Sequence, residues 1–167
     1  MEQNTLKKVA GGSFLTTPIN ESTIFSREDF TDEHKEIESM VKGFCKEEVA
    51  PAKDQLEKKN KELTFSLIKK VGELGLMGVE VPEEYGGMEL DKITGAIVAE
   101  SSSYSECSSF VVTWSTNLGI GSLPIVWFGT PAQKEKYLPK LIDGTSIGAY
   151  GLTEPSAGSD ALSAKTT

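Results

Sequence analysis

The chain has 167 residues, of which 38% are hydrophobic and 25% charged, and its formal net charge is −8. This composition is typical of a globular protein and excludes a disordered one. The excess of 25 acidic over 17 basic residues argues against a nucleic-acid partner, because neutralising phosphates requires clustered Lys and Arg. With His34 as the sole histidine, a zinc site and a His-based catalytic triad are also excluded.

The two cysteines, Cys45 and Cys107, lie far apart in the sequence, and we expect free thiols in a reducing compartment. The N-terminal residues lack an apolar run of signal-peptide length and lack the arginines of a transit peptide. No window approaches the roughly 20 apolar residues that a membrane span requires. These features predict a cytoplasmic protein.

The first 27 residues form a polar lead, which we expect to be extended or partly disordered. Its apolar residues are candidates for pinning it to a surface: Phe14, Leu15, Ile24 and Phe25. The first predicted helix begins after Thr31, a good N-cap, and ends at Pro51. His34 falls in its first turn, where we expect it to be solvated.

A charged stretch at 52–61 indicates a wet surface or a short solvated helix. The second predicted helix begins near Thr64, and Gly75 suits the residue just beyond its end. Residues 76–87 predict a short extended run that closes in a Gly-Gly turn. Asp91 is then a credible N-cap for a further helix.

Residues 108–128 are apolar nearly all round, which predicts a helix in the middle of a bundle, although a strand pair is also possible. Pro124 should kink or split this helix. Small or polar residues within this run indicate either close helix packing or the wall of a cleft: Asn117, Gly119, Gly121 and Ser122. Thr130 and Pro131 then start the next helix, Asp143 and Gly144 form a turn, and a strand is expected from Thr145.

The short apolar run from Ile147 to Leu152 alternates as a strand does, and the stretch from Tyr150 to Asp160 places hydroxyl groups and glycines at its end. Thr153 and Ser159 provide hydroxyls, while Gly151 and Gly158 let a flat ligand approach the backbone. Such a rim suits a polar ring edge or a phosphate, but an ordinary β-turn has the same composition. For Glu154 we expect a structural role, accepting backbone N–H bonds, rather than that of a general base.

Three motifs, in the same order and with similar spacing, resemble the acyl-CoA dehydrogenases. Gly151 to Asp160 (GLTEPSAGSD) resembles the signature of that family, and Val81 to Gly87 (VPEEYGG) resembles its short motif between helices. Gly129 to Pro139 (GTPAQKEKYLP) resembles the helix that leads into its middle domain. The resemblance runs from about Phe30 to the last residue, and the polar lead is most similar to the branch acting on long and very long acyl chains.

The resemblance implies a mainly α-helical fold: an N-terminal helical domain followed by the first strands of an incomplete, β-barrel-like middle domain. It divides the chain into a polar lead at 1–29, the helical domain at 30–144 and the start of the β-domain at 145–167. It implies FAD as cofactor, contacted by Tyr150, Gly151, Leu152, Thr153, Gly158 and Ser159. Ser159 would also lie near the CoA portion of the substrate, and no metal is implied.

The resemblance further implies α,β-dehydrogenation of a fatty acyl-CoA in β-oxidation, electron-transfer flavoprotein as acceptor and a homo-oligomeric full-length enzyme. The apolar helices from Ile93 to Phe128 would form a wall of the acyl-chain cavity, with Gly119, Gly121 and Ser122 at its floor. The family's catalytic glutamate belongs to a C-terminal bundle that has no counterpart here. We therefore expect the chain alone to be inactive. An acyl-CoA oxidase, a related flavin monooxygenase, or a non-catalytic helical interaction module are the alternatives.

Overall fold

The computed structural model describes residues 12, 15, 16, 18 and 25–166, which belong to two units, Met1–Asp32 and Glu33–Thr167. In the first unit, a 3₁₀ turn, η2 (Arg27–Asp29), is closed by a hydrogen bond from Ser26 N to Asp29 Oδ2 of 2.9 Å. The ring of Phe25 stacks on that of Phe30. Most of the polar lead, including Phe14 and Ile24, lies outside the described residues, so the expectation for it stays untested.

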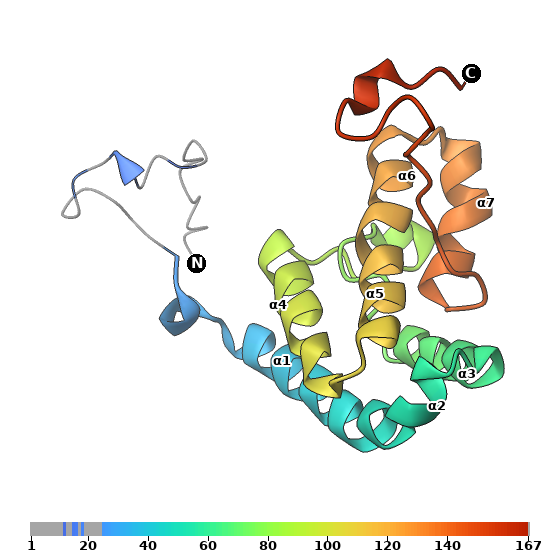
Figure 1. Cartoon of the computed structure of the whole chain (residues 1–167). Helices are drawn as coiled ribbons and strands as arrows, with labels where there is room; N and C mark the ends of the chain where they lie inside the picture. The colour runs from blue at the N-terminus through green and yellow to red at the C-terminus, as the bar shows by residue number, and fades with distance from the viewer. Residues whose placement is uncertain (1–11, 13–14, 17, 19–24, 167) are drawn as a thin grey trace. The chain divides into compact units, whose positions relative to one another are not determined.

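The second unit is built from helices in the part of the chain that the structure describes (Figure 1). The α-helices are α1 (Asp32–Phe44), α2 (Lys53–Glu57), α3 (Lys61–Glu73), α4 (Lys92–Ser102), α5 (Ser108–Thr116), α6 (Leu123–Phe128) and α7 (Pro131–Ile142). Short 3₁₀ and π turns join them: η3 (Cys45–Val49), η4 (Ala50–Ala52), η5 (Glu83–Tyr85), η6 (Ser103–Ser105), η7 (Asn117–Gly121) and η8 (Ala161–Ser163).

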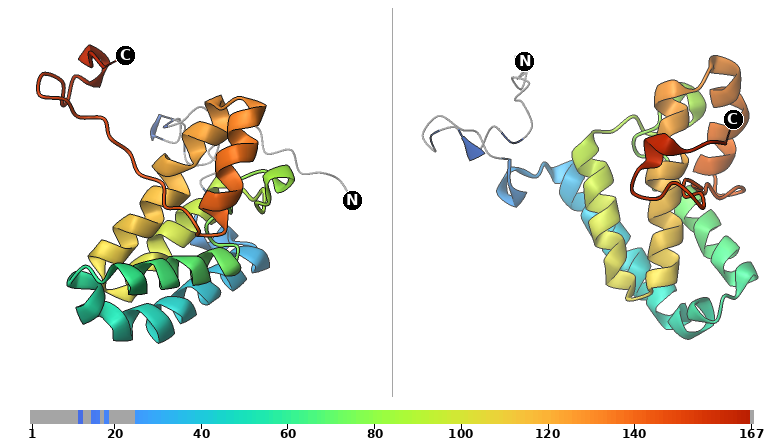
Figure 2. Two further views of the ribbon diagram at one scale, coloured as in Figure 1. Left: turned by 90° about the vertical axis from the view of Figure 1, so that its right-hand side faces the viewer. Right: turned by 45° about the horizontal axis from the view of Figure 1, so that its top comes forward.

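Helix α5 stands in the middle of these helices, as the apolar run at 108–128 predicts (Figures 1 and 2). Its Trp114 is 1% exposed and makes edge-to-face contacts with Phe44 and Phe110, with ring centroids 6.0 and 6.1 Å apart. The indole N–H donates to the carbonyl oxygen of Leu76 at 3.5 Å, so the polar edge of this large side chain is satisfied. Trp114 therefore joins α1, α5 and the loop after α3.

Several predicted helix boundaries are confirmed by their capping geometry. Asp91 caps α4 by accepting a hydrogen bond from Thr94 N at 2.8 Å. Thr130 and Gln133 form a reciprocal capping box at the start of α7. Gly75 and Gly144 both adopt positive φ just beyond a helix, the conformation that glycine accepts at least cost.

Two helix boundaries predicted for the first half of the chain were wrong. Pro51 does not end the first helical segment, because it lies at the start of η4, where its missing N–H costs nothing. The chain instead stays helical through η3 and η4 into α2, so the short helix expected within 52–61 is present, although its Leu56 is buried. Helix α3 begins at Lys61 rather than Thr64, because Asn60 accepts a hydrogen bond from Leu63 N and caps it.

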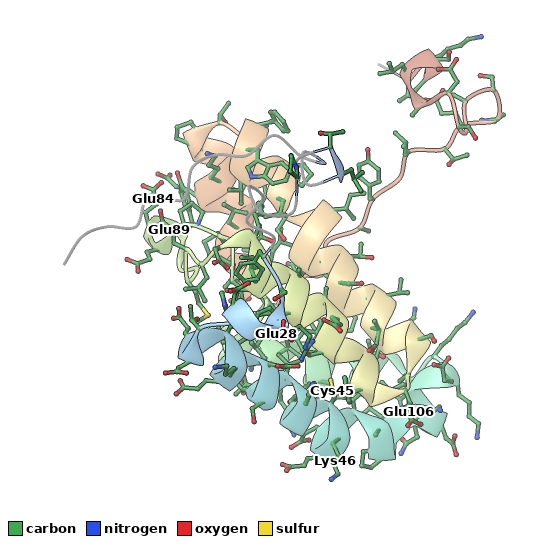
Figure 3. The ribbon with its side chains drawn as sticks, turned by 90° about the vertical axis from the view of Figure 1, so that its left-hand side faces the viewer. Glu28, Cys45, Lys46, Glu84, Glu89 and Glu106 are labelled. Atoms are coloured by element: carbon green, nitrogen blue, oxygen red, sulfur yellow. The ribbon has the colours of Figure 1, made fainter. Side chains whose placement is uncertain are left out.

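The loop between α3 and α4 consists of turns rather than the short extended run predicted at 76–87, although the chain does turn at Gly86 as expected. It folds back on itself through hydrogen bonds from Met88 N to Gly78 O and from Leu90 N to Val79 O. Glu84 and Glu89 lie on this loop (Figure 3). A Cβ at Gly87 would lie 2.0 Å from the carbonyl oxygen of Val81, so only glycine fits this crossing.

The predicted helix at 108–128 is split, as Pro124 indicates, although the break lies just before it. The helix widens into the π turn η7, and a new helix, α6, starts after Ser122 with Pro124 in its first turn. The hydroxyl of Ser122 donates to the carbonyl oxygens of Asn117 and Leu118, which satisfies groups that the irregular turn leaves without helical partners.

Among the described residues no strand forms, so the strand predicted at 147–152 is absent and the start of a β-domain is not seen. The segment after α7 leaves the helices and extends away from them (Figure 2). An isolated strand lacks the neighbours that stabilise a sheet, and the helical unit provides none. Among residues 12, 15, 16, 18 and 25–166, no helix is long and apolar enough to cross a membrane.

Candidate functional site

The segment that carries the candidate site residues is fastened to the helical unit at its base, residues 145–148. Thr145 N donates to Asp143 Oδ1 at 2.8 Å, and Ser146 N donates to Lys140 O at 2.9 Å. The side chain of Ile147 packs against the main hydrophobic core. The path of the chain is therefore set by contacts with α7 and the core up to this point.

Asn117 makes the last contact before the segment leaves the helices. This residue is fully buried, and its Oδ1 accepts a hydrogen bond from Gly148 N at 2.6 Å. Its Nδ2 donates to Leu141 O at 2.9 Å, at the end of α7. The sequence indicates close packing or a cleft wall at Asn117, but not this pair of hydrogen bonds, although an amide in an otherwise apolar run is a signal of a buried polar contact.

The six predicted cofactor-contacting residues lie on one exposed segment. The side chains of Tyr150 and Leu152 are 52% and 42% exposed, and Thr153 and Ser159 are exposed as well. A Cβ built on Gly151 or on Gly158 would meet no atom within 4 Å. Within the described chain, residues 149–153 make no hydrogen bond. Both backbone and side chains are thus open to a ligand or to another part of a larger protein.

Glu154 has the structural role that the sequence predicts. Its backbone pairs with Ala157 through two hydrogen bonds, of 2.9 and 3.1 Å, in an isolated antiparallel bridge. Its carboxylate accepts the backbone N–H groups of Lys165 and Thr166 at 2.8 and 2.9 Å. These hydrogen bonds lower the pKa of the Glu154 carboxyl below its ordinary value, and the bond from Lys165 N has the largest effect. The group is an anchor for the loop that follows it.

The prediction that His34 is solvated was wrong. Its side chain is buried, and Nε2 lies 3.3 Å from Oδ1 of Asp91. Burial is the largest influence on the Asp91 carboxyl and raises its pKa, but hydrogen bonds from Thr94 and His34 outweigh it, so the net pKa is lowered. The sequence predicts that His34 lies in the first turn of an amphipathic helix, but it does not show that the start of α4 packs against this turn.

The small residues of η7 are largely explained by packing. A Cβ at Gly121 would lie 3.0 Å from the Cα of Gly148, so the two backbones are in direct contact. Ser122 is buried and hydrogen-bonded, whereas Gly119 faces open space. Large apolar side chains remain exposed on α5, η7 and α6: Val112, Ile120, Trp127 and Phe128. The described chain thus exposes large apolar side chains on three consecutive elements.

Comparison with known proteins agrees with the motifs. The family profile described as "Acyl-CoA dehydrogenase, N-terminal domain" matches residues 31–145. The chain belongs to the acyl-CoA dehydrogenase family. A probable acyl-CoA dehydrogenase of Bacillus subtilis is 49% identical over 157 residues, which cover 94% of this chain and 26% of that protein.

Solved structures share the fold of this chain. An acyl-CoA dehydrogenase from Bacillus anthracis complexed with FAD has a TM-score of 0.85 and 47% identity, covering 95% of this chain and 27% of that one. A structure described as an electron transferring flavoprotein of Acidaminococcus fermentans has a TM-score of 0.71 and 37% identity, covering 85% of this chain and 37% of that one. The chain thus spans about a quarter of the length of the first two relatives.

Proposed function

We propose that this chain is the N-terminal part of an FAD-dependent acyl-CoA dehydrogenase, which oxidises the α,β bond of a fatty acyl-CoA. Membership of the family supports the reaction class. The presence of FAD in the Bacillus anthracis relative supports the cofactor. The observation that carries the proposal is the open segment 150–159, whose sequence resembles the family signature and whose backbone is unpaired up to Thr153.

The exposed segment is suited to an isoalloxazine edge. Leu152 and Thr153 would offer backbone groups and a hydroxyl to the ring, with Tyr150 and Gly151 beside them. Gly158 and Ser159 would lie near the pyrophosphate, and Ser159 also near the CoA portion of the substrate. The absence of any atom within 4 Å of a Cβ at Gly151 or Gly158 leaves room for a flat ring and a phosphate there.

When bound, FAD would accept the hydride from the β-carbon of the thioester. The residues of this chain would bind and orient the flavin and exclude water from one of its edges. Because Glu154 is engaged by Lys165 and Thr166, it is not available as the base that removes the α-proton. We therefore assign no catalytic residue to this chain and expect it to be inactive alone.

The same proposal covers the division of the chain and its partners. Residues 1–29 would be the lead, 30–144 the helical domain, and 145–167 the start of a β-domain that becomes a sheet only when its other strands are present.

The exposed apolar residues from Val112 to Phe128 would line the acyl-chain cavity. Electron-transfer flavoprotein would be the acceptor, the full-length enzyme a homo-oligomer, and the pathway cytoplasmic fatty acid β-oxidation.

A chimera tests the proposal. Residues 1–167 of this chain would be joined to the remaining part of the Bacillus anthracis enzyme, which is 47% identical over the aligned region. The expected result is a yellow protein with one flavin per chain that reduces a dye when an acyl-CoA is added. The 167-residue chain alone should show neither property. A folded, colourless chimera would contradict the proposal, and activity in the chain alone would contradict the assigned lack of a base.

A second candidate is a helical interaction module that docks on a complete dehydrogenase subunit. It is favoured by the uncovered apolar side chains of Trp127 and Phe128, which are 55% and 83% exposed. Size-exclusion chromatography of the chain mixed with a complete relative decides between them. A stable complex that leaves the relative's flavin content unchanged would support docking, and separate elution would exclude it.

A further inference from the structure

We propose that Asn117 is a positioning residue, which fixes the backbone at Gly148 and thereby sets the direction in which the segment 150–159 leaves the helices. The inference rests on the proposed function for its biological meaning. The contact itself, however, can be tested without any flavin. It is carried by three features of the described structure: the bonding of the amide, the backbone contact at Gly148 and the open chain that follows.

Both ends of the Asn117 amide are used, and each holds a different element. Nδ2 donates to Leu141 O at the end of α7 and also lies 3.8 Å from the sulfur of Met77. Oδ1 accepts from Gly148 N. Because the side chain is fully buried, neither bond has water as a ready substitute, which makes both costly to lose. Asn117 thus links α7 to the base of the segment.

The π turn η7 provides the geometry for this bridge. Asn117 is its first residue, and Ser122 donates its hydroxyl to the Asn117 carbonyl across the widened turn. Wide turns of this kind are rare in helices and are frequent at functional sites. In η7 the irregularity also leaves Gly121 close to Gly148, so that a Cβ on Gly148 would lie 3.0 Å from Gly121 Cα and 3.2 Å from Asn117 Oδ1.

Gly148 is the last hydrogen-bonded residue before the open stretch. The next hydrogen bonds, in chain order, are those between Glu154 and Ala157. Because residues 149–153 span at most about 17 Å, the position of Gly148 limits where Thr153 can lie. A displaced Gly148 would therefore move the point from which the segment must reach a flavin edge.

The first test is amide hydrogen exchange in the 167-residue chain. In Asn117→Ala, we expect the Gly148 amide to exchange about five- to tenfold faster, because it loses a buried acceptor. The matched control is Ser102→Ala, which removes a buried hydroxyl that donates to Ala99 O, away from the segment. It should leave Gly148 unchanged. Equal exchange at Gly148 in the native chain and in Asn117→Ala would overturn the proposal.

The second test measures direction rather than stability. Spin labels at Tyr150→Cys and Glu135→Cys report the distance between the start of the segment and α7, because Cys45 and Cys107 are buried. We expect a narrow distance distribution in the native background and in Ser102→Ala, and a broad one in Asn117→Ala. If Asn117→Ala does not fold, Gly148→Ala provides the same test, because its methyl group pushes Gly148 away from Gly121 and Asn117.

The two proposals fail in distinguishable ways. A distribution that stays narrow in both Asn117→Ala and Gly148→Ala would refute the role of Asn117, whatever the segment binds. Broad distributions together with a flavin-free chimera would uphold the role of Asn117 and refute the flavin site.

Discussion

Nε2 of His34, near the start of α1, lies 3.3 Å from Oδ1 of Asp91, the N-cap of α4. The same oxygen accepts hydrogen bonds from the backbone N and the hydroxyl of Thr94, each at 2.8 Å. One carboxylate therefore caps a helix and joins it to another helix start 57 residues away in the sequence. The stability of this junction depends on Asp91 more than on either of its neighbours.

Asp91→Ala should lower the free energy of unfolding by about 1–2 kcal/mol, because it removes an N-cap and leaves Thr94 N without its acceptor. Asp91→Asn should lose less than half of this, since Asn is as good an N-cap as Asp. Asp54→Ala, which removes an acid from the first turn of α2, is the control and should change stability by less than about 0.5 kcal/mol. Urea denaturation measures all three. Equal losses in Asp91→Ala and Asp54→Ala would contradict the capping role.

The loop after Glu154 should loosen as the pH falls. Because the pKa of Glu154 is lowered, its side chain is ionised at neutral pH and accepts hydrogen bonds from Lys165 N and Thr166 N. The stability that these two bonds contribute is fully present above the ordinary glutamate pKa. It is lost as the pH falls through the lower pKa of the folded state. The amide NMR signals of Lys165 and Thr166 should titrate together at that lower pH. Titration at or above the ordinary value, or persistence of both shifts in Glu154→Gln, would contradict the contact.

The thiol of Cys45 should be unreactive in the folded chain. It is buried and donates to Ser102 O at 3.5 Å, and burial raises its pKa to about 11. The residue is 0% exposed, and Figure 3 labels its position on the ribbon. With a thiol reagent at pH 8, the native chain should show no rapid modification, whereas unfolding in urea should release two thiols. A chain with an added surface cysteine, Glu62→Cys, provides the positive control. Rapid modification of the native chain would show that Cys45 or Cys107 is accessible.

Two glycine-to-alanine variants should have opposite effects. Gly87→Ala places a methyl group 2.0 Å from Val81 O, and we expect a loss of about 1–3 kcal/mol from the forced backbone shift. Gly43→Ala, within α1, meets no atom within 4 Å and should stabilise by about 0.5–1 kcal/mol through helix propensity. Thermal unfolding compares them directly. A stabilised Gly87→Ala would mean that the loop before α4 is not closed as described.

Local sequence signals predicted the helices and their caps well. The roles of Asp91 and Thr130 as N-caps and of Gly75 beyond a helix end could be predicted, because they follow from the residue type itself. The path through η3 and η4 could not, because Pro51 fits a helix start as well as a helix end. The partner of His34 could not be predicted either, because it depends on how α1 and α4 pack.

The candidate site shows the same division. The segment 150–159 was found from its composition and its resemblance to a family, and its openness was then seen in the structure. The two hydrogen bonds of Asn117 could not be predicted, because they go to backbone groups, at Leu141 and Gly148, that no local pattern connects to it. The strand expected at 147–152 depends on neighbouring strands that these 167 residues do not provide.

The most direct test of the central claim is flavin affinity in the chimera with the Bacillus anthracis enzyme when the open segment is altered. Gly151→Val fills the space beside the proposed ring edge, and Thr153→Val removes the proposed hydroxyl contact while keeping the side-chain shape. Gly43→Ala, far from the segment in sequence, is the control. We predict that Gly151→Val weakens FAD binding at least tenfold, equivalent to about 1.4 kcal/mol. Thr153→Val should weaken FAD binding by a smaller factor, and Gly43→Ala should bind FAD normally. Unchanged FAD affinity in both segment variants would contradict the assignment of 150–159 to the flavin.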